Sequence, residues 1–159
     1  VNTRFVSNVW GFDETAAPAA GKAGDGVIFP GGTPRWGIDA PGMKTMREIS
    51  KLSDPTGEKP RTLHYMRGVC SVFFMRDAMA MAAKNGPITG EAVKNALEQM
   101  RDHVPAELEG VCLPHTWTPE SHRGTNKVML YTSHWNDGNP QIKHLATIEL
   151  PQRDDWLGW

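Results

Sequence analysis

The segment from Ser7 to Trp10 holds the residue types that best suit binding of a small molecule. It follows a strand-like run and precedes a predicted helix start, and in open α/β sheets ligands bind beyond the carboxyl ends of strands. Ser7 and Asn8 supply short donors and acceptors, and Trp10 supplies a flat apolar wall. The alternative is a packed tryptophan beside two polar residues that cap a loop. We predict ligand contacts at Ser7, Asn8 and Trp10.

Tyr65 is a fourth candidate for the ligand site. It stands near the start of a long apolar helix, with Arg67 close behind it. Tyr65 either reaches a cleft or packs its ring in the core with its hydroxyl at the edge, which is the commoner arrangement for tyrosine.

Motifs for catalysis and metal binding are missing from the sequence. It contains no Gly-x-Ser-x-Gly, no His-Glu-x-x-His and no phosphate-binding glycine loop. The glycines of residues 21–26 precede a strand instead of following one, so a dinucleotide fingerprint fails on context. No two of the six histidines are three or four residues apart, and we expect them to be held by hydrogen bonds instead of binding zinc. We therefore predict no catalytic residue, no metal and no cofactor.

The amino-acid composition further limits the class of protein. Of the 159 residues, 39% are hydrophobic and 22% charged, which is ordinary for one compact soluble domain. The net charge of -1 offers no basic field for nucleic acid. Cys70 and Cys112 form no metal-type pair; an oxidising compartment would permit a disulfide, but Cys70 also suits a buried core thiol. The chain opens at Val1 on strand-like residues, and we expect a fragment or a processed form.

The elements that must position these residues alternate between strand and helix. Residues 4–8 are predicted as a strand, residues 14–22 as a helix capped by Asp13, and residues 26–30 as a buried parallel strand, which together make a βαβ unit. The Gly/Pro-rich residues 31–42 form a connector, where we place a lobe boundary.

Three helices follow the connector in the prediction. The first carries an apolar face of Met43, Met46, Ile49 and Leu52. The second, residues 62–84, is apolar nearly all round and is therefore expected to be buried. The third is capped by Thr89, with apolar residues at i, i+3, i+4 and i+7. Strands are then predicted at residues 115–118, 127–132 and 141–150, with a hairpin turn at 136–138; residues 151–159 show no regular pattern.

Six motifs in order give the chain a resemblance to a known family. They are WGFDE (10–14), GDGV (24–27), KPR with YMRG (59–61 and 65–68), GPITGEAV (86–93), TPESHRG (118–124) and KVMLY (127–131). The chain resembles the leucine/isoleucine/valine-binding proteins, which are type I periplasmic binding proteins of ABC transporters. The resemblance implies an α/β fold with parts of two doubly wound, Rossmann-like lobes joined by crossovers. It assigns residues 1–32 to the second lobe, 33–125 to the first, and 126–159 to a crossover and return to the second.

The resemblance also implies a function. The protein would bind a solute in a cleft between the lobes, which is incomplete in this chain. In the periplasm, it would deliver the solute to a membrane permease, without making or breaking a bond. Amino acid binders of the family carry an acidic residue where Val9 stands, so the ligand is expected to be an aromatic acid or other small carboxylate ahead of a branched-chain amino acid. Asp13 is the alternative partner for an ammonium group.

Two other functions stay open at this point. The same lobes could form a ligand-sensing regulatory domain, since fold does not fix function, or the chain could be a fragment of a Rossmann-like enzyme. We also expect it to pair with a missing N-terminal part of the same protein or to self-associate, because half-lobes leave apolar surface uncovered.

Overall fold

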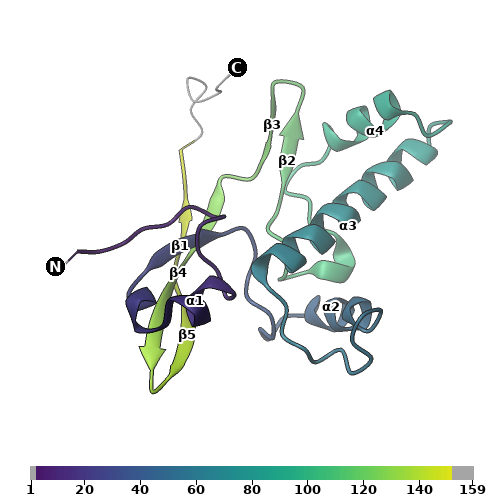
Figure 1. The fold of residues 1–159 in the computed structure, drawn as a ribbon. Helices are drawn as coiled ribbons and strands as arrows, with labels where there is room; N and C mark the ends of the chain where they lie inside the picture. Colours follow the sequence, from purple (N-terminus) through teal and green to yellow (C-terminus); the bar gives the residue numbers. More distant parts are fainter. Residues whose placement is uncertain (1–2, 152–159) are drawn as a thin grey trace. The chain divides into compact units, whose positions relative to one another are not determined.

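The computed structural model describes residues 3–151. The chain divides into two compact units (Figure 1). Unit 1 combines the residues up to Gly32 with those from Asn126 on, and unit 2 is Thr33–Thr125. Residues 152–159, for which we predicted no regular pattern, lie outside the described part. None of the helices within residues 3–151 has both the length and the apolarity of a membrane span.

Unit 1 is built on a three-stranded antiparallel sheet. The strands are β1 (Ile28–Gly31), β4 (Lys127–Asn136) and β5 (Asn139–Glu149), in the order β1-β4-β5. The predicted strand at residues 4–8 is reduced to one parallel bridge between Val6 and Ile28. There the Ser7 N–H donates to the Ile28 carbonyl over 2.8 Å. The parallel pairing of the βαβ prediction therefore exists, but over a single residue.

The hairpin between β4 and β5 forms at the predicted turn. Asn136 pairs with Asn139, and the two residues between them, Asp137 and Gly138, have φ of 44° and 87°. Positive φ at both central positions is the turn that matches the twist of paired strands, and Asp-Gly adopts it readily. Short-range turn chemistry thus sets the register of the longest strand pair.

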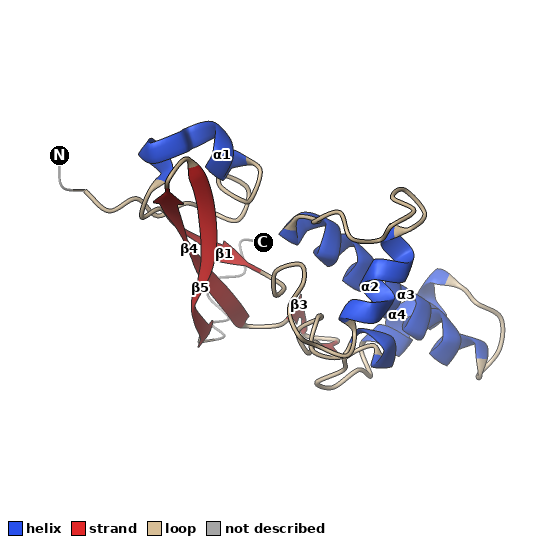
Figure 2. Cartoon of the chain, turned by 90° about the horizontal axis from the view of Figure 1, so that it is seen from below, coloured by secondary structure: helices blue, strands red, loops and turns tan. Residues whose placement is uncertain are grey.

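A short helical segment lies beside this sheet (Figure 2). The predicted helix at residues 14–22 is instead α1 (Ala16–Ala20) followed by the 3-10 turn η1 (Gly21–Gly24). The N-cap of α1 is Thr15 instead of the predicted Asp13, but the Asp13 Oδ1 atom still accepts from the N–H groups of Thr15 and Ala16 at 2.8 and 2.9 Å, just before the helix. Beneath it, the ring of Phe29 lies 5.4 Å from that of Phe12 and 5.8 Å from that of Tyr131, and all three are buried.

Unit 2 gathers three helices: α2 (Met43–Ser50), α3 (Leu63–Ala83) and α4 (Gly90–Leu97). The predicted cap at Thr89 is confirmed, and Thr62 caps α3 in the same way. The Thr62 hydroxyl accepts from the Tyr65 N–H over 3.2 Å, and the Thr89 hydroxyl accepts from the Ala92 N–H over 3.1 Å. Each satisfies one of the N–H groups that a helix start leaves without a partner.

The prediction that α3 is buried all round is wrong for the described chain. One face is buried, with Leu63, Met66, Cys70, Phe74, Ala78 and Ala82 recurring every three or four residues. A second apolar stripe is open to solvent, because Val72, Met75 and Met79 are 65%, 46% and 41% exposed. Leu52, predicted on the apolar face of the first helix, lies beyond the end of α2 and is 90% exposed.

A disulfide bond lies in the core of unit 2. Cys70 on α3 is bonded to Cys112, which follows the 3-10 turn η2 (Ala106–Leu108). The hairpin of β2 (Thr116–Thr118) and β3 (Ser121–Gly124) comes next; β2 falls within a predicted strand, whereas β3 was not predicted. In this hairpin Trp117 packs edge-on against Phe74, with ring centroids 5.3 Å apart.

Candidate functional site

The predicted ligand segment is a tight turn held at both ends by unit 1. At its start, Ser7 is fixed by its backbone bond to Ile28 of β1. At its end, Phe12 is buried against Phe29. The segment leaves the single parallel pair at its carboxyl end, which is the position predicted for a ligand loop.

Hydrogen bonds inside the turn fix its shape. The Asn8 Oδ1 atom accepts from the Trp10 N–H over 2.9 Å, and the Asn8 carbonyl accepts from the Ser7 hydroxyl and the Gly11 N–H at 3.1 and 3.3 Å. Gly11 leaves room for the Ser7 hydroxyl: a Cβ at this position would stand 2.5 Å from Ser7 Oγ, so the hydroxyl would have to turn away. Sequence reasoning found the three polar and aromatic residues but missed Gly11, whose role becomes visible only in the closed turn.

The outer surface of the turn is aromatic and has no acidic side chain. Trp10 is 72% exposed, and Asn8 is exposed beside it. No residue from Ser7 to Phe12 is acidic, and Val9 stands half-buried at the position that the resemblance assigns to an acidic group. Asp13, the alternative ammonium partner, uses its Oδ1 on the start of α1 and on the Thr15 hydroxyl at 2.6 Å. The carboxylate nearest to the turn therefore helps to hold the start of α1.

The fourth predicted residue, Tyr65, belongs to unit 2. It is half-buried in the first turn of α3. The Arg61 guanidinium lies 5.2 Å from its ring centroid, and the Trp36 ring meets it edge-on at 6.3 Å. The structure thus brings Ser7, Asn8 and Trp10 together in one turn and places Tyr65 in a separate aromatic cluster with Trp36, whose participation the sequence did not indicate.

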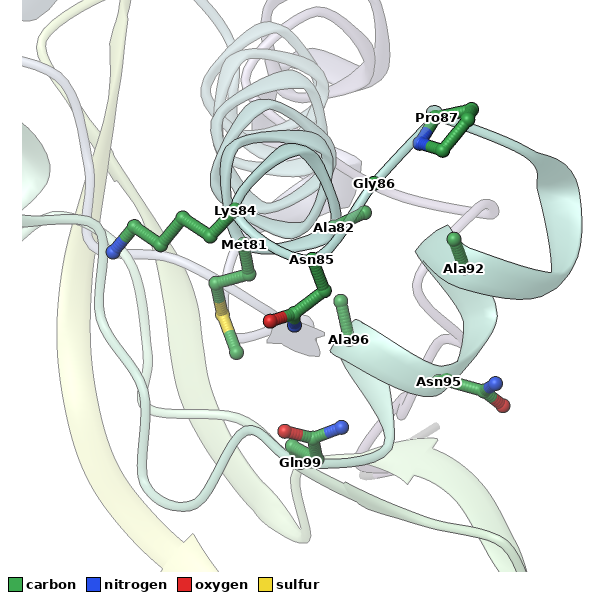
Figure 3. A pocket seen from close by; sticks show the side chains of 10 residues that line it. All are labelled: Met81, Ala82, Lys84, Asn85, Gly86, Pro87, Ala92, Asn95, Ala96 and Gln99. Carbon is green, nitrogen blue, oxygen red and sulfur yellow. The ribbon is translucent and has the colours of Figure 1, made fainter.

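An open groove of about 460 Å³ lies between the end of α3 and α4 (Figure 3). Its walls are apolar at Met81, Ala82, Ala92 and Ala96. The polar side chains around it do not converge: Asn85 and Gln99 face the groove, whereas Lys84 and Asn95 extend to opposite sides (Figure 3). The groove lacks the convergent polar groups that fix the orientation of a small ligand.

Charged side chains of unit 2 form ion pairs with one another. Arg76 makes two hydrogen bonds to Glu107, both 2.8 Å, and these, with a bond to Asp77, raise the pKa of Arg76. His103 Nε2 lies 2.8 Å from the other oxygen of Asp77. His115 is half-buried against Phe74, and burial lowers the pKa of its imidazole.

Among residues 3–151, no three histidine, cysteine, aspartate or glutamate side chains are grouped to hold a metal ion. Of the six histidines that we expected to be held by hydrogen bonds, His103, His115, His122 and His144 each take part in a contact with another polar group.

Comparison with known proteins shows which family the chain matches. A family model described as periplasmic binding protein matches residues 1–139. No curated protein matches the sequence.

Three solved structures show the same fold. The chain is similar to an ABC transporter substrate binding protein from Aeropyrum pernix (TM-score 0.75, 22% identity), with 97% of this chain and 40% of that one covered. It is similar to a branched chain amino acid ABC transporter from Thermus thermophilus with bound valine (TM-score 0.74, 16% identity; 94% and 40%). It is also similar to a fatty acid ABC transporter substrate-binding protein from Thermomonospora curvata (TM-score 0.67, 15% identity; 94% and 38%). The chain spans about two fifths of the length of these proteins.

Proposed function

The chain belongs to the periplasmic binding protein family, and from this premise we propose that it is part of the solute-binding component of an ABC importer. The predicted fold class is confirmed: the chain is a fragment of the type I periplasmic-binding-protein fold. Family and neighbours are binding proteins, so the proposed role is reversible binding of a solute without bond chemistry. The proposed solute is an aromatic acid, another small carboxylate or a branched-chain amino acid.

The observation that carries this proposal is the preorganised turn at Ser7–Gly11. A turn that is closed by its own hydrogen bonds and anchored at both ends gives up little conformational entropy when a ligand arrives. It stands at the carboxyl end of a parallel-paired residue, where α/β folds bind their ligands. Ser7, Asn8 and Trp10 are the proposed contacts in unit 1, and Tyr65 is the proposed contact in unit 2.

The division of the chain supports the proposed lobe assignment. The unit boundaries at Gly32 and Asn126 fall where the resemblance places the crossovers. We assign residues 1–32 and 126–159 to the second lobe of the receptor and residues 33–125 to the first.

The Cys70–Cys112 disulfide supports an extracytoplasmic location. Disulfides persist in oxidising compartments such as the periplasm and are rare in the cytosol. A periplasmic receptor delivers its solute to a membrane permease, which is the proposed partner.

The uncovered apolar stripe on α3 supports a further protein contact. Val72, Met75 and Met79 expose a contiguous apolar strip of a kind that folded proteins normally cover. The proposed partner is the remaining part of the same receptor, or a second copy of the chain in its absence.

Native mass spectrometry of the purified protein, with a denatured run beside it, tests the solute-binding role. The expected native spectrum carries a small extra mass that is lost on denaturation, and the released compound is a carboxylate that stays chemically unchanged when it is returned to the protein. Conversion of that compound into another product would instead identify an enzyme.

A further inference from the structure

We propose that Asn85 is a site of spontaneous chemical modification, in which solvent water converts its side-chain amide into a carboxylate through a cyclic imide formed with Gly86. The reaction needs no enzyme and no ligand, so this inference does not depend on the proposed solute-binding role. Asn85 and Gly86 belong to the link between α3 and α4, and both line the groove between these helices (Figure 3).

The sequence and the local space both favour ring closure at this pair. Asn85 is the one asparagine of the sequence that is followed by glycine. A side chain on the following residue hinders the approach of its backbone nitrogen to the asparagine Cγ atom, and glycine has no such side chain. A Cβ atom built on Gly86 would meet no atom beyond its chain neighbours within 4 Å, so the surroundings leave room for the ring as well.

The hydrogen bonds of the folded chain leave the reacting groups available. The Asn85 N–H donates to the Ala82 carbonyl over 3.0 Å. Among residues 3–151, however, neither the Gly86 N–H nor the Asn85 side chain has a hydrogen-bond partner, and both residues are exposed. The Gly86 nitrogen can therefore turn toward the Asn85 side chain without breaking a hydrogen bond within the protein.

The reaction balances with water as its only co-reactant. A base in solution removes the Gly86 N–H proton, and the nitrogen attacks Cγ of Asn85. The N–Cγ bond forms and the Cγ–Nδ2 bond breaks, which releases ammonia. Water then adds to one of the two imide carbonyls. Cleavage of the bond to Cγ leaves aspartate, whereas cleavage of the bond to the main-chain carbon leaves isoaspartate, in which the main chain runs through the former side chain.

The product changes both the charge and the length of the link between the helices. A carboxylate at position 85 lies just beyond the C-terminal end of α3, where the helix carbonyls already concentrate negative partial charge, so it is less favourable there than the amide. It also adds a negative charge to a groove that is apolar at Ala82 and Ala92. The isoaspartate form adds a methylene group to the main chain. The modification therefore alters the groove between α3 and α4.

Asp25 and Gly26 provide a matched control site in the same chain. The Gly26 N–H donates to the Ser133 carbonyl over 2.8 Å, and the Asp25 Oδ1 atom accepts from the Trp135 N–H over 3.0 Å. The substitution Asp25→Asn gives this site the same pair of residue types, but with the nitrogen and the side chain both held. A hydrogen bond of ordinary strength that must break before attack slows a reaction roughly tenfold.

The experiment incubates the purified full chain at mildly alkaline pH in heavy-oxygen water, once folded and once in guanidinium chloride. Samples are digested at acidic pH, where the imide forms slowly, and peptide masses report the heavy oxygen incorporated at each asparagine. The ratio of the folded to the unfolded rate at one position cancels the effect of its sequence neighbours. Asn85→Gln, whose longer side chain does not form the same ring, identifies the signal of Asn85, and circular dichroism shows that each variant is folded.

We expect the folded and unfolded rates at Asn85 to agree within roughly threefold, because no hydrogen bond within the protein must break first. At position 25 of Asp25→Asn, the folded rate should fall roughly tenfold or more below the unfolded rate.

Two outcomes would overturn the inference. A folded rate at Asn85 that is roughly tenfold below its unfolded rate would show that the fold protects the amide. Faster incorporation at another asparagine of the folded chain would show that the modification belongs elsewhere. If Asp25→Asn does not fold, the ratio at Asn85 still decides, because it is measured in the unsubstituted chain.

Discussion

Breaking the Cys70–Cys112 bond should strongly destabilise unit 2. The bond joins residues 42 apart in sequence, and both sulfurs lie in the core, where each cysteine is 5% exposed. The chain-entropy relation for a loop of this length gives about 4 kcal/mol of stabilisation at 25 °C. Because domains of this size have unfolding free energies of about 5–15 kcal/mol, the bond supplies a large share of the total.

Urea unfolding followed by circular dichroism at 222 nm measures this loss, since α2, α3 and α4 all belong to unit 2. With a slope of about 1.5 kcal/mol/M, the midpoint should fall by roughly 2–3 M when dithiothreitol is added. The double variant Cys70→Ala/Cys112→Ala is the control, because its midpoint should be low and insensitive to the reductant. Two titratable thiols in the untreated native protein, or equal midpoints with and without reductant, would refute the reasoning.

Three further predictions concern unit 2. In urea unfolding, Gly124→Ala should destabilise unit 2 by about 1–3 kcal/mol more than Gly37→Ala. Both positions have positive φ, but only at Gly124 would a Cβ meet a neighbour, which is His115 at 2.5 Å. Equal losses of stability would contradict this. Hydrogen bonds from Lys94 and then His122 lower the pKa of Glu98. The contribution of Glu98 to the free energy of unfolding should therefore be full above about pH 4.3 and be lost as the pH falls through its lower pKa in the folded protein. In acid unfolding, Glu98→Gln should remove that dependence. Burial lowers the pKa of His115. Its effect on stability should therefore be absent above about pH 6.5, and stability should decline as the pH falls toward the pKa of His115 in the folded protein. His115→Gln should flatten that decline, and an unchanged slope would contradict the assignment.

Local signals in the sequence predicted the elements that are stabilised locally. The cap at Thr89 and the Asp-Gly turn depend on residues within three positions of one another, and each formed where predicted. The helix starting at Met43 and the long strands were also found, because their apolar periodicity extends over several residues.

Features that depend on distant partners were missed or misjudged. Apolar residues all round α3 indicated complete burial, but burial depends on what covers a helix, and the described chain covers only one face. The choice between a free thiol and a disulfide at Cys70 needed the position of Cys112 in space. The ion pairs of Arg76 with Glu107 link residues 31 apart and leave no periodic trace in the sequence.

The candidate site was partly predictable, because its residues in unit 1 are neighbours in the sequence. Residue types and order singled out Ser7, Asn8 and Trp10, which do share one turn. Gly11 escaped notice, because its close approach to the Ser7 side chain exists only once the turn has closed.

The most direct test of the central claim is a calorimetric titration of the protein with the solute identified from its native complex, followed by recovery of the solute. The account predicts saturable binding of one solute per receptor, weakened by Asn8→Ala and by Trp10→Ala, with the whole solute recovered unchanged after prolonged incubation. Consumption of more than one equivalent of solute, or binding that neither variant affects, would contradict it.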